Sequence, residues 1–134
     1  MSHHRIRSGG EFETRLGYCR AVVTDDGWVH VAGTVGVDRA TGAVPDAVEE
    51  QCRHALAIIG DALDQAGAGF ADVVRVTYML PDRDDFAACW PLLSDTFGAH
   101  PPAATMIECR LIDDRFKIEI EVTAKMAGAR VHPA

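Results

Sequence analysis

Residues 117–124 read Lys-Ile-Glu-Ile-Glu-Val-Thr-Ala and alternate strictly between polar and apolar side chains. The apolar positions are Ile118, Ile120, Val122 and Ala124, and the polar ones are Lys117, Glu119, Glu121 and Thr123. Successive side chains of a β-strand point to opposite faces, so this pattern predicts a strand over residues 116–124 with one face toward a core. The sheet that contains this strand therefore has two unlike faces.

A second strand is predicted upstream, over residues 104–111. Its more apolar face carries Thr105, Ile107, Cys109 and Leu111, and its other face carries Ala104, Met106, Glu108 and Arg110. We expect the helices to pack on the side of Ile118, Ile107 and Val76. The opposite face then meets solvent or another subunit, which favours an oligomer.

The rest of the chain supplies three more strands and two helices. The strands are predicted over residues 20–24, 28–33 and 72–80, and the helices over residues 46–66 and 83–97. Apolar residues recur at steps of three and four along the longer helix, which gives it one face toward the core. The order β-β-α-β-α-β-β predicts an α+β domain of two layers, a mainly antiparallel mixed sheet with both helices on one face.

The chain of 134 residues has the length of one domain. We expect a flexible N-terminal arm over residues 1–13, the domain over residues 14–127 and a C-terminal tail over residues 128–134. No apolar run approaches the roughly 18 residues that span a bilayer, and no signal peptide is evident. The expected location is the cytoplasm.

Charge and cysteine spacing exclude some classes of site. Thirteen Lys and Arg residues against twenty Asp and Glu give a net charge of −7, which repels nucleic-acid phosphates and anionic membranes. The four cysteines, Cys19, Cys52, Cys89 and Cys109, form no CxxC pair, so no metal site is predicted. A small molecule is a more plausible ligand than a nucleic acid or a membrane.

Several short stretches, in order and at matching intervals, resemble the RidA/YjgF family, whose members often carry the label endoribonuclease L-PSP or translation inhibitor. The stretches are Gly17-Tyr18-Cys19-Arg20-Ala21, Val29-His30-Val31-Ala32-Gly33, Ala66-Gly67-Ala68, Asp72-Val73-Val74-Arg75, Asp85-Phe86, Pro102-Ala103-Ala104-Thr105 and Lys117-Ile118-Glu119-Ile120-Glu121. The resemblance implies a chorismate-mutase-like α+β fold and a homotrimer with three clefts between subunits. It also implies cofactor-free hydrolysis of an enamine or imine, such as 2-aminoacrylate, to a keto acid and ammonia.

Four positions match the family's cleft residues: Tyr18, Gly33, Thr105 and Glu119. The resemblance implies that Glu119 positions or activates water and that Tyr18 shapes the pocket. Four other positions depart from the pattern. Ala104 replaces the arginine that holds the substrate carboxylate, Ala32 replaces a serine, Met106 a cysteine and Trp90 an asparagine.

The loss of the arginine predicts a changed substrate. A bidentate arginine–carboxylate contact supplies two charge-assisted hydrogen bonds, each contributing about 1.5–3 kcal/mol, and Ala104 supplies neither. Without a neighbouring cation, Glu119 would also repel a small anion. Trp90 and Met106 make the site more apolar, so we expect a neutral or aromatic ligand rather than the usual small 2-imino acid.

Other residues have two interpretations each. His30 is either a structural hydrogen-bonding residue or a proton carrier in the site. Arg110 or Arg75 either replaces the missing cation or pairs with a carboxylate such as Glu108 or Glu121. Glu119 alone would also fit a solvated strand face, and Trp90 would fit a helix core.

Two other functions remain open at this point. One is a ligand-binding or interaction protein that kept the fold and lost the chemistry. The other is RNA cleavage or translation inhibition, which conflicts with the acidic charge.

Overall fold

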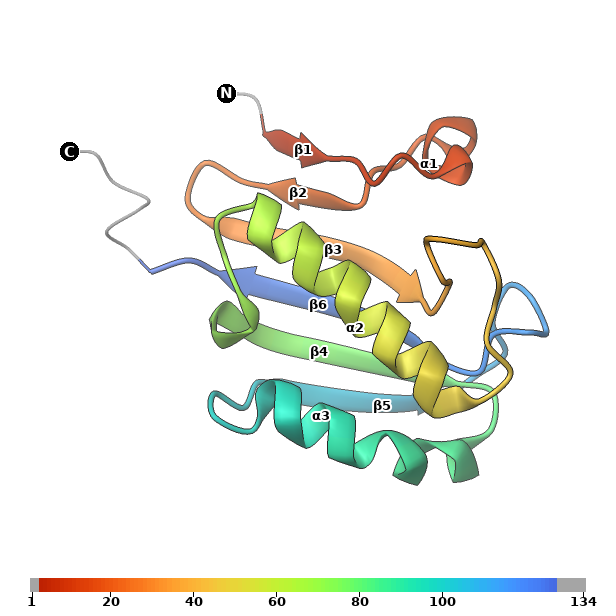
Figure 1. The fold of residues 1–134 in the computed structure, drawn as a ribbon. Coiled ribbons are helices and arrows are strands. Elements are labelled where there is room, and N and C mark those ends of the chain that lie inside the picture. Colours follow the sequence, from red (N-terminus) through yellow and green to blue (C-terminus); the bar gives the residue numbers. More distant parts are fainter. Residues whose placement is uncertain (1–2, 128–134) are drawn as a thin grey trace.

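The computed structural model describes residues 3–127 and consists of a six-stranded sheet with its two longer helices on one face (Figure 1). The elements in chain order are β1 (His4–Ile6), α1 (Glu11–Leu16), β2 (Ala21–Val23), β3 (Trp28–Val35), α2 (Val48–Gln65), η1 (Phe70–Asp72), β4 (Val73–Leu80), η2 (Arg83–Cys89), α3 (Trp90–Phe97), β5 (Ala103–Glu108) and β6 (Glu119–Lys125). The sheet order is β1-β2-β3-β6-β4-β5, antiparallel except for the parallel pair β4–β5. The predicted α+β fold with a mainly antiparallel mixed sheet is confirmed.

The core lies between α2 and the central strands. Apolar side chains of α2 that recur every three or four residues are fully buried, and they meet the alternating apolar side chains of β3, β4 and β6. The fully buried members with the largest side chains are Ile59, Leu63, Leu80, Ile118, Ile120, Val29, Val76 and Val122. Burial of each such side chain stabilises the fold by about 1.5–3 kcal/mol. We call the side of the sheet under α2 and α3 the helix face, and the other side the open face.

The second predicted helix, over residues 83–97, is divided in two. Residues Arg83–Cys89 form the 3₁₀ helix η2, and α3 begins at Trp90 with Pro91 in its first turn. Proline has no backbone N–H and its ring crowds the carbonyl four residues earlier, so it suits the start of a helix and not its interior.

The N-terminal segment differs from the expected flexible arm. β1 pairs with β2 through His4–Val23, Arg5–Val22 and Ile6–Ala21, and Ile6 is buried in the core. Glu13 in α1 is only 4% exposed. A strand of three residues with one apolar side chain is too short to show a period of two, so the sequence pattern does not reveal it. The predicted tail, residues 128–134, lies outside the described residues.

The two faces of β5 are the reverse of the prediction. Ala104 is the register partner of Val76, and Met106 is the partner of Tyr78, in the parallel β4–β5 ladder. Val76 and Tyr78 are buried under the helices, and register partners point to the same side, so Ala104 and Met106 lie on the helix face. Thr105 and Ile107 lie on the open face. β5 is an edge strand with little cover on either side, so hydropathy did not distinguish its faces.

Candidate functional site

Glu119 opens β6 on the open face, between Val35 of β3 and Met79 of β4. Its carboxylate lies directly over Gly33, where a methyl group would collide with it. The register of β3 shifts between Val31 and Thr34, so Gly33 sits in a bulge. Two of the residues that the sequence singled out, Gly33 and Glu119, therefore meet, and the missing side chain at residue 33 makes the room.

Burial raises the pKa of the half-buried Glu119 carboxyl, and the negative charge of Glu121 raises it further. The positive charge of Arg20 acts in the opposite direction and lowers this pKa. The three effects leave Glu119 a stronger base than an exposed glutamate. The sequence left open whether a cation lies near Glu119 and named Arg110 and Arg75 as candidates; the structure shows that Arg20 acts on Glu119 instead.

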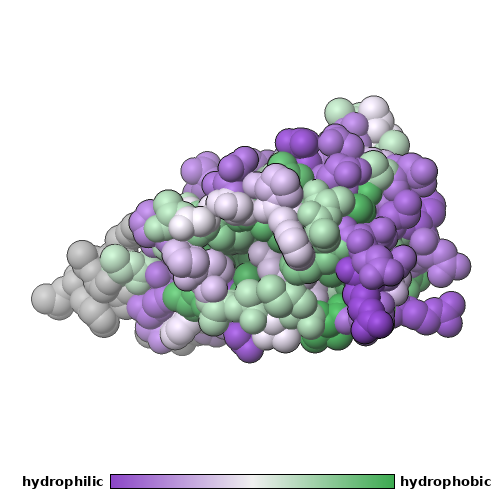
Figure 2. All heavy atoms as spheres, turned by 90° about the horizontal axis from the view of Figure 1, so that it is seen from below, coloured by the Kyte–Doolittle hydropathy of each residue, from purple (hydrophilic) through white to green (hydrophobic). Residues whose placement is uncertain are grey.

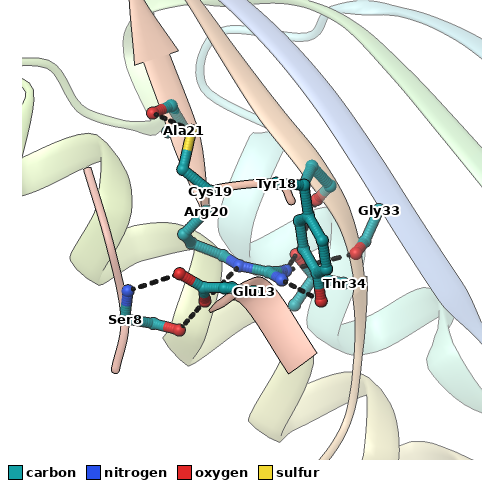
Figure 3. Close-up of polar contacts among 9 residues, drawn as sticks. Ser8, Glu13, Tyr18, Cys19, Arg20, Ala21, Gly33 and Thr34 are labelled. Atoms are coloured by element: carbon teal, nitrogen blue, oxygen red, sulfur yellow. Dashed lines mark hydrogen bonds and ion pairs between the residues drawn. The ribbon is translucent and has the colours of Figure 1, made fainter. Parts of the chain in front are cut away.

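Arg20 connects Tyr18 to the Gly33 bulge (Figure 3). One amino group, Nη1, donates to the Gly33 carbonyl at 3.2 Å and to Thr34 Oγ1 at 2.9 Å, and Nη2 donates to the Tyr18 hydroxyl at 3.4 Å. The guanidinium also lies over the Tyr18 ring, 5.6 Å from its centroid. Arg20 is only 9% exposed, so it contacts the other members of this cluster from the interior of the protein. We call Tyr18, Arg20, Gly33 and Glu119 the Glu119 cluster.

A buried carboxylate balances the charge of Arg20. Glu13 Oε2 lies 3.7 Å from Arg20 Nε, and Ser8 donates to Glu13 through both its backbone N–H and its hydroxyl. The Nε of Arg20 itself has no hydrogen-bond partner among residues 3–127. α1 places Glu13 here and ends at Gly17, whose φ of 77° suits glycine.

Sequence reasoning missed Arg20 and Glu13 as members of the site. Arg20 stands inside the family-like stretch that contains Tyr18, and that position was the available signal. A charged residue beside a predicted strand is usually solvated, so its burial could not be inferred from the pattern.

Trp90, Met106 and Ala104 form a second group on the helix face, at the β5 edge. Trp90 is 59% exposed and lies edge-on against Phe86, with ring centroids 6.5 Å apart, so it is not a core residue. Met106 and Phe86 line a hollow of about 280 Å³ together with Leu80, Arg83, Ile107 and Glu108. Figure 2 views the molecule from the edge formed by β5 and α3, and it shows apolar residues gathered across the middle of that edge. We call Trp90, Ala104 and Met106 the apolar edge group.

The structure therefore brings the predicted residues together in two groups and not in one site. The Glu119 cluster and Thr105 belong to the open face or the loop before β2, whereas Ala104 and Met106 lie on the opposite face. Within a single chain, the sheet separates the two groups.

The remaining predicted residues lie outside both groups. His30 is exposed on the open face, and its ring stacks against Trp28 at 6.4 Å. Arg110 is exposed beyond the end of β5. Arg75 donates to Thr105 Oγ1 at 3.2 Å, and Glu108 accepts the backbone N–H of Arg83 at 2.9 Å. These contacts differ from the predicted pairing of Arg75 or Arg110 with a carboxylate.

Neither a metal cluster nor a membrane-spanning helix is present in the described part of the chain. Residues 3–127 contain no group of three or more His, Cys, Asp or Glu side chains placed to hold a metal ion. None of the helices in that range has both the length and the apolar character to cross a membrane.

Comparison with known proteins gives consistent matches. A family model described as endoribonuclease L-PSP matches residues 10–126. A 2-iminobutanoate/2-iminopropanoate deaminase from goat (Capra hircus) is 33% identical over 122 residues, which cover 90% of this chain and 88% of the relative. A member of the YjgF/YER057c/UK114 family from Mycobacterium tuberculosis has a similar solved structure, with a TM-score of 0.84, 36% identity and coverage of 93% of this chain and 100% of that chain. For the YjgF gene product of E. coli the TM-score is 0.75 with 31% identity, over 82% of this chain and 88% of that chain.

Proposed function

The chain belongs to the endoribonuclease L-PSP family, also called the RidA/YjgF family, and from this premise we propose that it is a homotrimeric, cofactor-free hydrolase of imines or enamines with an altered substrate preference. The observation that carries the proposal is the half-buried Glu119 carboxylate over Gly33, with its raised pKa. The relatives named 2-iminobutanoate/2-iminopropanoate deaminases support the reaction type.

Imine hydrolysis requires a proton acceptor and a proton donor in sequence. Glu119 accepts a proton from water while the water oxygen bonds to the imine carbon. Glu119 returns this proton to the nitrogen, which also takes up the remaining proton of the added hydroxyl group. The carbon–nitrogen bond then breaks, and ammonia leaves a carbonyl group behind. An enamine first gains a proton on carbon and loses one from nitrogen, which converts it to the imine. A base with a pKa raised toward neutrality suits both transfers.

The separation of the two groups supports a trimer. In a cleft between subunits, the Glu119 cluster of one chain faces the apolar edge group of the next. Each half is then incomplete without its neighbour, and three equivalent clefts result. Size-exclusion chromatography with light scattering tests this assembly.

The four free cysteines suit the reducing cytoplasm, where we place the protein.

The apolar edge group sets the altered preference. Ala104 offers no cation, and the exposed Trp90 and Met106 offer flat or flexible apolar surface. We propose that imines with larger apolar side chains are better substrates than those of 2-iminopropanoate size.

A coupled assay tests the activity. An amino-acid oxidase generates imines from phenylalanine or from alanine, and keto-acid release is measured with and without the protein. We expect faster release from the phenylalanine-derived imine, and a roughly 100-fold or greater loss in Glu119→Gln. Glu50→Gln, on the surface of α2, is the matched control and keeps full activity. A wild-type protein that accelerates neither reaction would contradict the proposed catalysis and favour the alternative of a ligand-binding protein without chemistry.

The stability of Glu119→Gln separates lost chemistry from lost folding. The folded state raises the pKa of Glu119, so it binds a proton more tightly than the unfolded state. Stability from this group is present at low pH and is lost as pH rises through the folded pKa. At pH 7 the charge is destabilising, so Glu119→Gln melts at the same temperature as wild type or higher.

A further inference from the structure

A second hollow, of about 280 Å³, lies beside Tyr18 where β1 and α1 approach the loop that leads to β2. It is lined by Arg5, Arg7, Glu13, Thr14, Gly17, Tyr18 and Cys19. Tyr18 is the one residue of this hollow that also belongs to the Glu119 cluster. Its volume suits a metabolite smaller than a drug-sized ligand.

Two arginines line this hollow, and the pairing of β1 with β2 positions one of them. Ile6 pairs with Ala21 and is buried on the helix face. Its neighbour within the strand, Arg5, therefore points to the opposite side, because strand residues alternate. Arg7 follows directly after β1 and lines the same hollow. Arg5 pairs with Val22, which pairs with His30 on the open face. Arg5 thus lies on the face that carries Glu119.

The charges of Arg5 and Arg7 are not neutralised by the protein. Both side chains are exposed, and within residues 3–127 neither forms an ion pair or a side-chain hydrogen bond. The carboxylate that lines the hollow, Glu13, is buried and occupied by Ser8 and Arg20. The hollow is therefore locally cationic in a chain with a net charge of −7. Guanidinium groups recognise carboxylates in bidentate geometry.

We propose that this hollow binds the substrate carboxylate, and that Arg5 and Arg7 supply the cation that Ala104 no longer provides. The inference rests on the proposed function and assigns the place where the carboxylate end of its imine substrate is held, in contrast to the neutral ligand expected from the sequence. Tyr18 is the link, because it lines the hollow and accepts a hydrogen bond from Arg20, which in turn holds Gly33 beneath Glu119. When Arg5 and Arg7 hold the carboxylate of a ligand, the remainder of that ligand lies beside Tyr18.

Binding of an unreactive probe tests the inference without catalysis. We would titrate ¹⁵N-labelled protein with phenylacetate and with its uncharged isostere phenylacetamide, and follow the arginine Nε–H and backbone signals by NMR. Phenylacetate is expected to shift the signals of Arg5, Arg7 and residues 17–19. The double variant Arg5→Gln/Arg7→Gln should bind phenylacetate about tenfold more weakly or worse. Arg39→Gln/Arg53→Gln, which removes two exposed arginines elsewhere, should bind it as wild type does.

Three results would overturn the inference. The first is that phenylacetamide binds as tightly as phenylacetate, and the second is that the Arg5→Gln/Arg7→Gln variant keeps wild-type affinity for phenylacetate. The third is that inorganic phosphate at equal concentration displaces phenylacetate fully, which would show a general anion site. Both arginines are exposed, so their replacement leaves the fold intact, and a melting curve verifies this.

Failure of the proposed function can be distinguished from failure of this site. Glu119→Gln is expected to bind phenylacetate normally, so binding without any deaminase activity would contradict the proposed reaction alone. Deaminase activity with an unchanged KM for the phenylalanine-derived imine in Arg5→Gln/Arg7→Gln would contradict the carboxylate site alone.

Discussion

Arg20 places a buried positive charge between two carboxylates, Glu13 and Glu119. Its charge lowers the pKa of Glu119 against burial and the repulsion of Glu121. The β3 and β4 register neighbours of Glu119, Val35 and Met79, are uncharged. We predict that Arg20→Gln raises the pKa of Glu119. The acid limb of the pH–rate profile then moves to higher pH, because the reaction needs the ionised carboxylate.

Two further variants make this prediction decisive. Arg20→Gln leaves Glu13 buried without its partner and weakens folding, whereas Glu13→Gln/Arg20→Gln removes both charges together. Arg20→Lys keeps the charge and loses the two-pronged guanidinium that contacts Gly33 and Thr34 through Nη1 and Tyr18 through Nη2. Glu119 should then titrate near its wild-type pH at reduced kcat. Carboxyl ¹³C NMR reads the titration directly, and an unchanged Glu119 pKa in the Gln variants would refute the role of Arg20.

Two glycines three residues apart should respond differently to the same change. A methyl group at Gly33 meets the end of the flexible Glu119 side chain, whereas one at Gly36 meets the backbone of Gln51 in α2. We predict that Gly33→Ala displaces the carboxylate and lowers kcat with little change in stability. Gly36→Ala should destabilise the fold by about 1–3 kcal/mol, because helix backbone cannot move aside. Urea unfolding and the deaminase assay on both variants measure the contrast.

At the scale of elements, α2 is tied to the loops around it by one buried amide. Gln51 donates to the carbonyls of Pro45 and Arg115 at 2.7 and 2.9 Å, and accepts the N–H of Lys117 at 2.8 Å. These contacts fix the segment that leads into β6 and Glu119. We predict that Gln51→Leu lowers the free energy of unfolding by about 3 kcal/mol, since three backbone groups lose a partner. Gln65→Leu, exposed at the end of α2, should change it by less than about 0.5 kcal/mol.

The elements that bury one clear face were predictable from the sequence. α2, β3, β4 and β6 have long apolar periods, and each exists close to its expected place. β1 and the faces of β5 were not predictable, because an edge strand buries too little surface to impose a pattern. Division of the second helix was signalled by Pro91, which the apolar spacing of residues 83–97 concealed.

The candidate site was also predictable in part: some of its residues could be named from the sequence, but their contacts could not. The positions of Tyr18, Gly33 and Glu119 came from resemblance, and the structure brings them together around Arg20. The role of Arg20 depends on contacts with residues 13, 33 and 34, which are distant in sequence or in a different element. No local pattern encodes such a cluster. The separation of Ala104 and Met106 from Glu119 depends on the β4–β5 register, and the sequence prediction for the faces of this strand was wrong.

At the scale of the whole molecule, the proposed trimer would bury the open face. Ile107 is 43% exposed there, next to Met79, whereas Ile112 is 94% exposed in the loop before β6. We predict that Ile107→Lys converts the trimer to monomers, because a charge would be buried between subunits. Ile112→Lys adds the same charge and should leave the trimer intact. Light scattering reports the mass of each, and a monomeric wild-type protein would contradict the assembly.

The short β1 strand limits how far the N-terminus of this protein can be truncated. Beginning the chain at Gly17, where the family-like stretches start, would strip the outer edge from β2. The freed N–H and C=O groups of β2 would then invite pairing between molecules and aggregation. The same truncation would delete Arg5, Arg7 and Glu13 together, and with them the hollow that we propose as the carboxylate site.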